Sequence, residues 1–236
     1  YKECEDLYLI NGKNEDQIAW KKLFYKGDLD LLNRPKITQK QYIQMFGNYT
    51  FNYNWSKPAI ENTRELLQKP KSCLEIGTFE GRFAIWLAET YKCSVTAVDP
   101  FDGSKYGIAK EIFVEAERNC RNNFANCKQD IDLIQGESFD VMNEMYLNKR
   151  SFDFIYIDGS HLARDVLADM VMAYRLLRED GIILLDDSVS WKARDHISNE
   201  TIHDPSQSPR MAVDNFIHIH WKEIEVLKLP HSGQVA

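Results

Sequence analysis

The chain has 236 residues, of which 44% are hydrophobic and 12% aromatic, so it carries enough apolar material for a packed core and is not a disordered chain. Its 36 acidic residues outnumber its 29 Lys and Arg residues, and the net charge of -7 leaves no general attraction to a polyphosphate backbone, so we expect a small-molecule substrate and no nucleic-acid partner. No apolar run approaches the roughly 20 residues that span a bilayer, and the charged N-terminus is not a signal peptide, which predicts a cytoplasmic protein without a membrane partner.

Residues 1–57 differ from the rest of the chain. They are polar, contain a helix-like piece over residues 18–24, and show no alternation of strands and helices. We interpret them as an N-terminal extension that acts as a lid or as an arm through which copies of the chain form a homo-oligomer. Within it Tyr49, Phe51, Tyr53 and Trp55 alternate with polar residues, which predicts an extended segment with one aromatic face. These rings either pack on the main domain or line a substrate pocket.

Residues 58–236 alternate between strand and helix patterns, which is typical of an α/β fold with a doubly wound, mostly parallel sheet. Strands are predicted over 72–76, 94–98, 131–134, 152–157, 182–185 and 223–229, and helices over about 58–68, after Gly81, over about 108–124, over about 161–177 and near 211–219. Gly181 suits the turn that follows the fourth of these helices. One catalytic domain with an N-terminal extension explains the whole chain.

A glycine turn follows the first predicted strand and precedes a helix. It reads Glu75-Ile76-Gly77-Thr78-Phe79-Glu80-Gly81, and it lies at the sheet edge where α/β proteins bind nucleotides. It matches neither Gly-x-Gly-x-x-Gly nor a loop ending in Gly-Lys-Ser/Thr. Its two acids would repel a pyrophosphate, but they could accept hydrogen bonds from the amino group of an amino-acid moiety. The loop therefore favours S-adenosylmethionine over NAD or ATP. Asp99, about 20 residues further on, stands where such folds hold ribose hydroxyls.

These motifs resemble those of the class I methyltransferases. Residues 74–81 are similar to the first motif of that family, residues 97–101 to its ribose-binding strand end, and Gly136-Glu137-Ser138 to its adenine-contacting turn. The resemblance implies that the loop with Glu75, Gly77, Thr78, Phe79 and Gly81 surrounds the methionine part of the cofactor. Asp99 would bind the ribose, and Ser138 would lie near the adenine. The family fold has a Rossmann-like seven-stranded sheet whose final strand is antiparallel.

Acidic residues follow two further predicted strands. Asp158 ends one strand, and Asp186 and Asp187 end the next, so the three carboxylates should converge beside the cofactor. Carboxylates that converge repel one another unless a cation lies among them, and a hard divalent cation such as Mg²⁺ prefers oxygen ligands. The alternative is that these acids only form turns or cap the following segment.

The 28-residue spacing from Asp158 to Asp186 resembles the metal-dependent O-methyltransferases, both the catechol type and the sugar enzymes of antibiotic pathways. In the catechol type the last of the three ligands is an amide, whereas Asp187 matches the sugar enzymes. The resemblance makes Asp158, Asp186 and Asp187 metal ligands and places Asp158 beside the cofactor. It also makes His161 the general base, although a His early in a helix is often only a surface residue.

We therefore expect a Mg²⁺-assisted O-methyltransferase that acts on a small molecule with vicinal oxygens, such as a sugar, a polyketide or a catechol. The competing hypotheses are a metal-independent N- or C-methyltransferase and a non-catalytic cofactor-binding protein. His218 and His220 lie two apart near a helix end, so we interpret them as structural. Trp191 and residues 196–209 are predicted to form a mobile loop over the active site.

Overall fold

The computed structural model describes residues 36–53, 56–104, 108–186, 193–194, 201–202 and 209–227. Its elements in chain order are α3 (Gln39–Met45), α4 (Lys57–Leu66), β1 (Ser72–Ile76), α5 (Arg82–Tyr91), β2 (Ser94–Asp99), α6 (Lys110–Asn126), β3 (Ile131–Gln135), α7 (Ser138–Leu147), β4 (Phe152–Ile157), α8 (Ala163–Leu176), β5 (Leu177–Leu185), β6 (Ala193–Arg194), β7 (Thr201–Ile202) and α9 (Pro209–His220).

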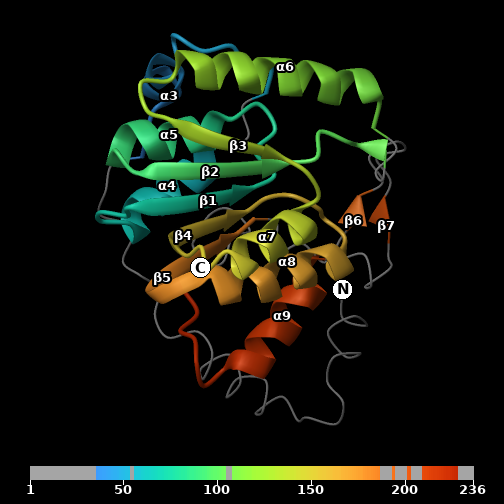
Figure 1. Ribbon diagram of the computed structural model, residues 1–236. Helices are drawn as coiled ribbons and strands as arrows, with labels where there is room; N and C mark the ends of the chain where they lie inside the picture. Colours follow the sequence, from blue (N-terminus) through green and yellow to red (C-terminus); the bar gives the residue numbers. More distant parts are fainter. Residues whose placement is uncertain are drawn as a thin grey trace.

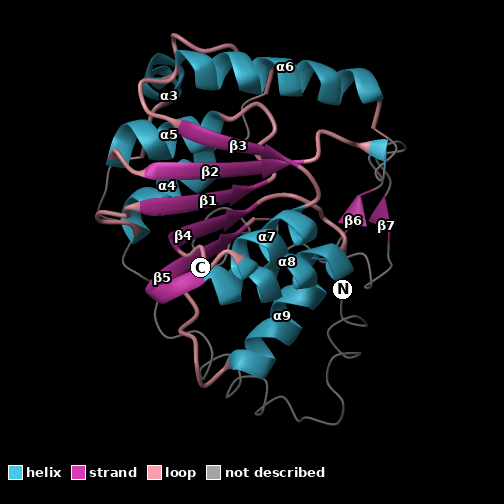
Figure 2. Cartoon of the chain, in the orientation of Figure 1, coloured by secondary structure: helices cyan, strands magenta, loops and turns pink. Residues whose placement is uncertain are grey.

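Five parallel strands form the central sheet in the order β3-β2-β1-β4-β5. Helices cover both of its faces, as Figure 1 and the secondary-structure colouring of Figure 2 show. β1, β2 and β4 are short apolar runs that are buried on both faces, which explains why they read as continuous hydrophobic segments rather than as alternating ones. The α/β class and the parallel sheet are confirmed, whereas the seven strands that the resemblance implied are not, since the described residues give the sheet five.

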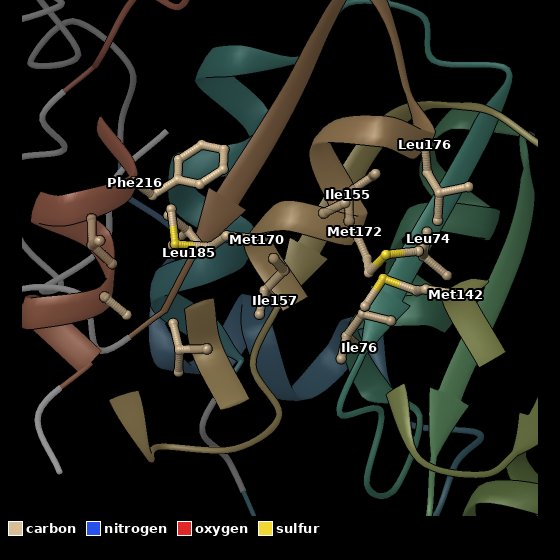
Figure 3. Packing of buried hydrophobic residues seen from close by; sticks show 14 of the residues in the cluster. Leu74, Ile76, Met142, Ile155, Ile157, Met170, Met172, Leu176, Leu185 and Phe216 are labelled. Atoms are coloured by element: carbon tan, nitrogen blue, oxygen red, sulfur yellow. The ribbon is translucent and has the colours of Figure 1, made fainter. Parts of the chain in front are cut away.

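One apolar core lies between the sheet and helices α7, α8 and α9. Leu74 and Ile76 of β1, with Ile155 and Ile157 of β4, point toward methionine and leucine side chains of α7 and α8 (Figure 3). Met142, Met170 and Leu176 are at most 2% exposed. Flexible methionines fill irregular gaps well, so this face is tightly packed and holds the ends of β1 and β4 in place.

The other face is covered by α4, α5 and the segment before them, and it is rich in aromatic rings. Phe83 of α5 lies 4.4 Å from the Tyr156 ring of β4 and 5.5 Å from Trp86, measured between ring centroids. Aromatic pairs at such distances stabilise a core beyond their buried area. This packing fixes the direction of the Tyr156 side chain.

Residues 36–53, which we call the N-terminal strap, pack on this second face. Tyr42 and Phe46 are buried, and the guanidinium of Arg82 lies 4.0 Å from the centre of the Phe51 ring. The predicted extended segment is present but belongs to no strand. Its rings pack on the main domain, as one of the two interpretations held. Trp55 and the helix-like piece over 18–24 lie outside the described residues.

The structure differs from the predicted secondary structure in four places. Helix α7 was not predicted. α8 begins at Ala163, so His161 precedes the helix. β5 begins at Leu177, directly after α8, so Gly181 and the left-handed Asp180 beside it, with φ 61°, both lie inside β5, where the pairing with β4 is irregular. Residues 223–227 form no strand, because the chain turns over 221–223 and the buried Val226 then packs on the first core.

His220 has the structural surroundings that its position suggested. Its ring lies 4.6 Å from the Tyr174 ring and 4.5 Å from the Phe216 ring, and Nδ1 is 2.9 Å from an oxygen of Glu223. These contacts join the end of α9 to α8. None of the described helices is both long and apolar enough to cross a bilayer.

The predicted loop over residues 196–209 is described only in part. β6 and β7 form a short antiparallel pair, with Ala193 opposite Ile202 and Arg194 opposite Thr201. In Figure 1 this pair lies beyond the tips of the parallel strands, toward the carboxyl edge of the sheet. Trp191 and the rest of the predicted loop lie outside the described residues.

Candidate active site

Four residues stand side by side at the carboxyl edge of the sheet. Val98 pairs with Ile76, Ile76 with Ile157, and Ile157 with Leu185. The residue that follows each of these is therefore at the same level, and across the sheet the row reads Asp99, Gly77, Asp158 and Asp186. Three carboxylates thus line one edge, with a glycine between the first two. We call these four residues the acidic row.

Gly77 is needed where β1 meets the end of β4. Its φ is +86°, and a Cβ built on it would lie 2.1 Å from the carbonyl oxygen of Asp158. Its N–H donates to the carbonyl oxygen of Val98 at 2.8 Å, which turns the chain away from β1 toward β2. Only glycine fits this conformation and this approach. The second loop glycine, Gly81, has φ +81° and caps α5.

Asp99 holds two backbone turns at once. Its Oδ2 accepts from the N–H of Phe79 at 2.8 Å, and its Oδ1 accepts from the N–H of Phe101 at 2.7 Å. Both phenylalanines have left-handed backbones, with φ 50° and 51°, a strain that often marks a functional loop. The pKa of Asp99 is raised to about 6, chiefly by burial and to a smaller extent by the nearby Asp158 carboxylate, against the lowering effect of the two N–H donors.

Glu75 is turned into the protein, where its side chain is 2% exposed. Its Oε2 accepts from the hydroxyl of Thr78 at 2.7 Å. Burial raises the pKa of Glu75 well above its ordinary value, and the Asp158 and Asp99 carboxylates act in the same direction. Glu75 therefore braces the loop from below, two residues before Gly77 on the same strand.

Glu80 does not serve the role that the sequence suggested, which was to accept from the amino group of a cofactor. Its carboxylate is buried and accepts hydrogen bonds from the backbone of the N-terminal strap: from the N–H of Asn52 at 2.9 Å and from that of Tyr53 at 3.1 Å. The side-chain amide of Asn119 donates to it at 3.0 Å. Both oxygens are thus used to fix protein segments.

The Tyr156 hydroxyl connects Asp158 to Asp186. It lies 3.0 Å from Oδ2 of Asp158 and 2.5 Å from Oδ2 of Asp186. Tyr156 is fully buried, and burial raises the pKa of its hydroxyl well above the ordinary value, as do the two carboxylates. Two of the three predicted metal ligands are therefore brought together. Asp187 lies outside the described residues, and within those residues no group of three or more His, Cys, Asp or Glu side chains could hold a metal ion.

His161 lies in the connection between β4 and α8. Its side chain is 41% exposed, and Nε2 is 3.9 Å from Oδ1 of Asp158. It is therefore at the edge of the acidic row and open enough to meet an incoming substrate.

The turn after β3 also reaches this edge. The N–H of Gly136 donates to the carbonyl oxygen of Asp99 at 3.2 Å, and Glu137 precedes the first residue of α7. The Ser138 hydroxyl donates to Oδ1 of the buried Asp169 on α8, at 2.5 Å. The turn stands where the prediction put it, while its contact with adenine stays a prediction.

Three of these residues carry too little signal in the sequence for their contacts to be predicted. Tyr156 reads as one more apolar strand residue, Glu80 as a loop acid, and Asp169 as a polar residue of an amphipathic helix. Asp169 falls three residues after Val166 and one before Met170, on the buried side of the stripe that predicted α8, and a buried acid in such a stripe signals a partner.

Comparison with known proteins agrees with this fold. A family described as methyltransferase domain matches residues 74–188. The O-methyltransferase ankF of Aspergillus thermomutatus is 28% identical over 124 residues, which are 52% of this chain and 47% of that protein. The chain thus spans about half the length of this relative.

Solved structures share the fold at low identity. A protein of Klebsiella pneumoniae that is assigned as an O-methyltransferase matches with a TM-score of 0.51 and 19% identity, over 90% of this chain and 86% of that one. A protein of Staphylococcus aureus assigned to the caffeoyl-CoA O-methyltransferases matches with a TM-score of 0.51 and 14% identity over 99% and 95%. Residues 74–188, which run from β1 to just beyond β5, thus form a methyltransferase domain. The family match covers just under half of the chain, so the assignment applies to this part of it.

Proposed function

We propose that this protein transfers a methyl group from S-adenosylmethionine to a hydroxyl of a small molecule with vicinal oxygens, and that a divalent cation, Mg²⁺ in the first instance, assists the transfer. The acidic row carries this proposal, because it gathers Asp99, Asp158 and Asp186 at the sheet edge where doubly wound folds bind their ligands. The similarity to an O-methyltransferase supports an oxygen acceptor.

The charge of the row suits the cofactor. S-adenosylmethionine carries a sulfonium and an ammonium group, and carboxylates stabilise both by Coulomb attraction. The glycine between Asp99 and Asp158 lets a ligand approach the backbone closely. In this assignment Asp99 accepts from the ribose hydroxyls with the lone pairs that Phe79 and Phe101 leave over, and the loop from Glu75 to Gly81 surrounds the methionine part.

The oxygen donors at the second half of the row fit a hard cation. Asp158 and Asp186 would hold it, with Asp187 as the proposed third ligand. Such an ion, when bound, supplies Lewis-acid chemistry that lowers the pKa of an acceptor hydroxyl. Tyr156 contacts one oxygen of each carboxylate and so holds the two groups at a defined separation.

His161 is the proposed general base. An unperturbed imidazole accepts a proton near neutral pH, and the partial exposure of His161 gives access to an acceptor. Asp158, 3.9 Å away, would stabilise the imidazolium that forms once the proton has moved. The acceptor oxygen would then attack the sulfonium methyl in line, forming the C–O bond as the methyl C–S bond breaks and S-adenosylhomocysteine leaves, with both molecules held together by the site.

Removal and return of the metal tests the proposal. Methyl transfer to catechol, sugar-diol and polyketide acceptors should fall to background after EDTA treatment and return with Mg²⁺. Undiminished transfer after EDTA would favour a metal-independent N- or C-methyltransferase, with the acids contacting substrate directly. Cofactor binding without transfer to any nitrogen, carbon or oxygen acceptor would favour a non-catalytic binding protein.

A further inference from the structure

We propose that the N-terminal strap is a working part of the cofactor site, and that Glu80 is the positioning residue that couples the strap to the cofactor loop. The inference rests on the proposed binding of S-adenosylmethionine. It assigns a function to a buried acid of the loop and to residues 50–53, which otherwise read as a peripheral extension.

Glu80 belongs to the loop by sequence and to the strap by its contacts. Its Oε1 accepts from the N–H of Asn52 at 3.0 Å and from the Asn119 amide at 3.0 Å. Its Oε2 accepts from the N–H groups of Asn52 and Tyr53, at 2.9 and 3.1 Å. A carboxylate that is 3% exposed needs such donors, and the strap backbone supplies most of them. The loop therefore keeps this conformation only with the strap in place.

Two neighbouring side chains fasten the same junction. The Asn123 side chain exchanges two hydrogen bonds with the backbone of Thr50, at 2.9 and 2.8 Å, and also donates to the carbonyl oxygen of Glu80 at 3.1 Å. Arg82 donates to the carbonyl oxygen of Tyr53 at 2.8 Å. Backbone groups of strap and loop thus meet through Glu80, Arg82 and Asn123.

The strap also reaches the residue that binds Asp99. The Tyr53 ring lies 5.4 Å from the Phe79 ring in an edge-to-face arrangement, and Phe79 lies 5.8 Å from Phe113 of α6. Phe79 holds a left-handed backbone, a conformation that persists only where its surroundings enforce it. Its N–H donates to Asp99, the proposed ribose ligand. Tyr53 therefore supports the backbone geometry on which the cofactor site depends.

Coupling of this kind is reciprocal: what stabilises the docked strap should favour cofactor binding, and bound cofactor should stabilise the docked strap. Glu80→Gln is the sharpest variant, because both oxygens face N–H donors. Either orientation of the amide then sets its NH₂ group against a donor. Glu89→Gln is the matched control, since Glu89 accepts from the Tyr49 hydroxyl of the same strap at 2.6 Å but lies outside the cofactor loop.

The experiment measures S-adenosylhomocysteine affinity by calorimetry for the full chain and both variants, at a temperature where circular dichroism shows all three folded. Amide exchange of residues 50–53 is followed with and without that ligand. We expect Glu80→Gln to bind about tenfold more weakly, Glu89→Gln to bind like the parent, and the ligand to slow exchange over 50–53 in the parent.

Equal affinity of Glu80→Gln and the parent, or exchange over 50–53 that ignores the ligand, would overturn the coupling while leaving the methyltransferase proposal intact. No binding of S-adenosylhomocysteine by the parent chain would instead overturn the proposed function, and this inference with it.

Discussion

A single hydroxyl, that of Tyr156, joins the ends of two neighbouring strands. Two carboxylate oxygens, one from Asp158 and one from Asp186, lie within 3.0 Å of this hydroxyl and share its single proton. The hydroxyl therefore sets the spacing between the two carboxylates. Hydrogen bonds to the ligands of a metal are typically needed for full affinity. Tyr156 is thus the residue through which the proposed cation site can be tested without removing a ligand.

Tyr156→Phe keeps the ring and removes this hydroxyl. We expect the affinity for Mn²⁺, measured by electron paramagnetic resonance, to fall about 10–100-fold. Tyr174→Phe is the matched control, because it removes a 3.0 Å bond to Glu223, a carboxylate outside the site. If both variants bound Mn²⁺ like the parent chain, Tyr156 would have no part in holding a cation.

His161→Ala tests the base. Loss of a positioned base typically costs about 10²–10⁴-fold in rate, and His161 lies outside the cofactor loop, in the connection between β4 and α8. Turnover should therefore drop by at least about 100-fold, while the affinity for S-adenosylhomocysteine stays within about twofold. Turnover at the parental level would show that another group, or solvent, takes the proton.

Asp99 gives the site a pH dependence with a defined direction. Its pKa of about 6 in the folded chain exceeds the value of about 3.9 for an unfolded one, so deprotonation costs folding free energy as pH rises through about 6. Ribose hydroxyls need the ionised carboxylate as their acceptor. Cofactor affinity should therefore weaken about tenfold between pH 7 and pH 5, as calorimetry at both pH values would show. Asp99→Asn should bind weakly at both, and a pH-independent parental affinity would contradict the ribose assignment.

At the scale of elements, the junction of β1 with β4 sets the shape of the site. Gly77→Ala would place a methyl group 2.1 Å from the Asp158 carbonyl oxygen at a φ of +86°. We expect a loss of about 2–4 kcal/mol in the free energy of unfolding, measured with urea. The control, Gly47→Ala, adds a Cβ 3.7 Å from its nearest neighbour and should change stability by no more than about 0.5 kcal/mol. Equal midpoints for the two variants would show that the junction tolerates a side chain.

Strands were easier to predict than their surroundings. β1, β4 and most of β2 match the predicted bounds, because a parallel strand buried on both faces must be a short apolar run. Helix α7 was missed because its buried Met142 and Met145 stand among exposed apolar residues such as Phe139 and Leu147, which blurs the periodicity. Gly181 was expected in a turn, since glycine is the usual residue after a helix end, but β5 begins directly after α8 and includes it.

The candidate site was predictable where chemistry and register coincide. Asp99, Asp158 and Asp186 each end a strand, and adjacent parallel strands bring their carboxyl ends together. Neither Tyr156 as the partner of Asp158 and Asp186 nor the strap as the partner of Glu80 was predictable, because both contacts arise from tertiary packing. Nothing in the local pattern of Phe152–Ile157 distinguishes a strand tyrosine that only fills the core from one that binds two carboxylates.

For the molecule as a whole, helical layers cover both faces of the sheet (Figure 1). The carboxyl edge of the sheet carries the acidic row, and the N-terminal strap is hydrogen-bonded to Glu80 of the loop at that edge. Residues 1–57 were interpreted as a lid or as an arm that joins copies of the chain. Residues 36–53 pack on the methyltransferase domain of their own chain. Association between copies of the chain stays a prediction. If the strap, the loop and the strand ends form the binding site together, that site requires residues 36–53 in addition to residues 74–188.

The measurement that tests the central proposal most directly is a calorimetric titration of the chain with S-adenosylmethionine at neutral pH. We predict saturable binding of one molecule per chain, strongly weakened in Asp99→Asn. No detectable heat and no competition by S-adenosylhomocysteine at millimolar concentration would contradict the assignment of the acidic row as a cofactor site.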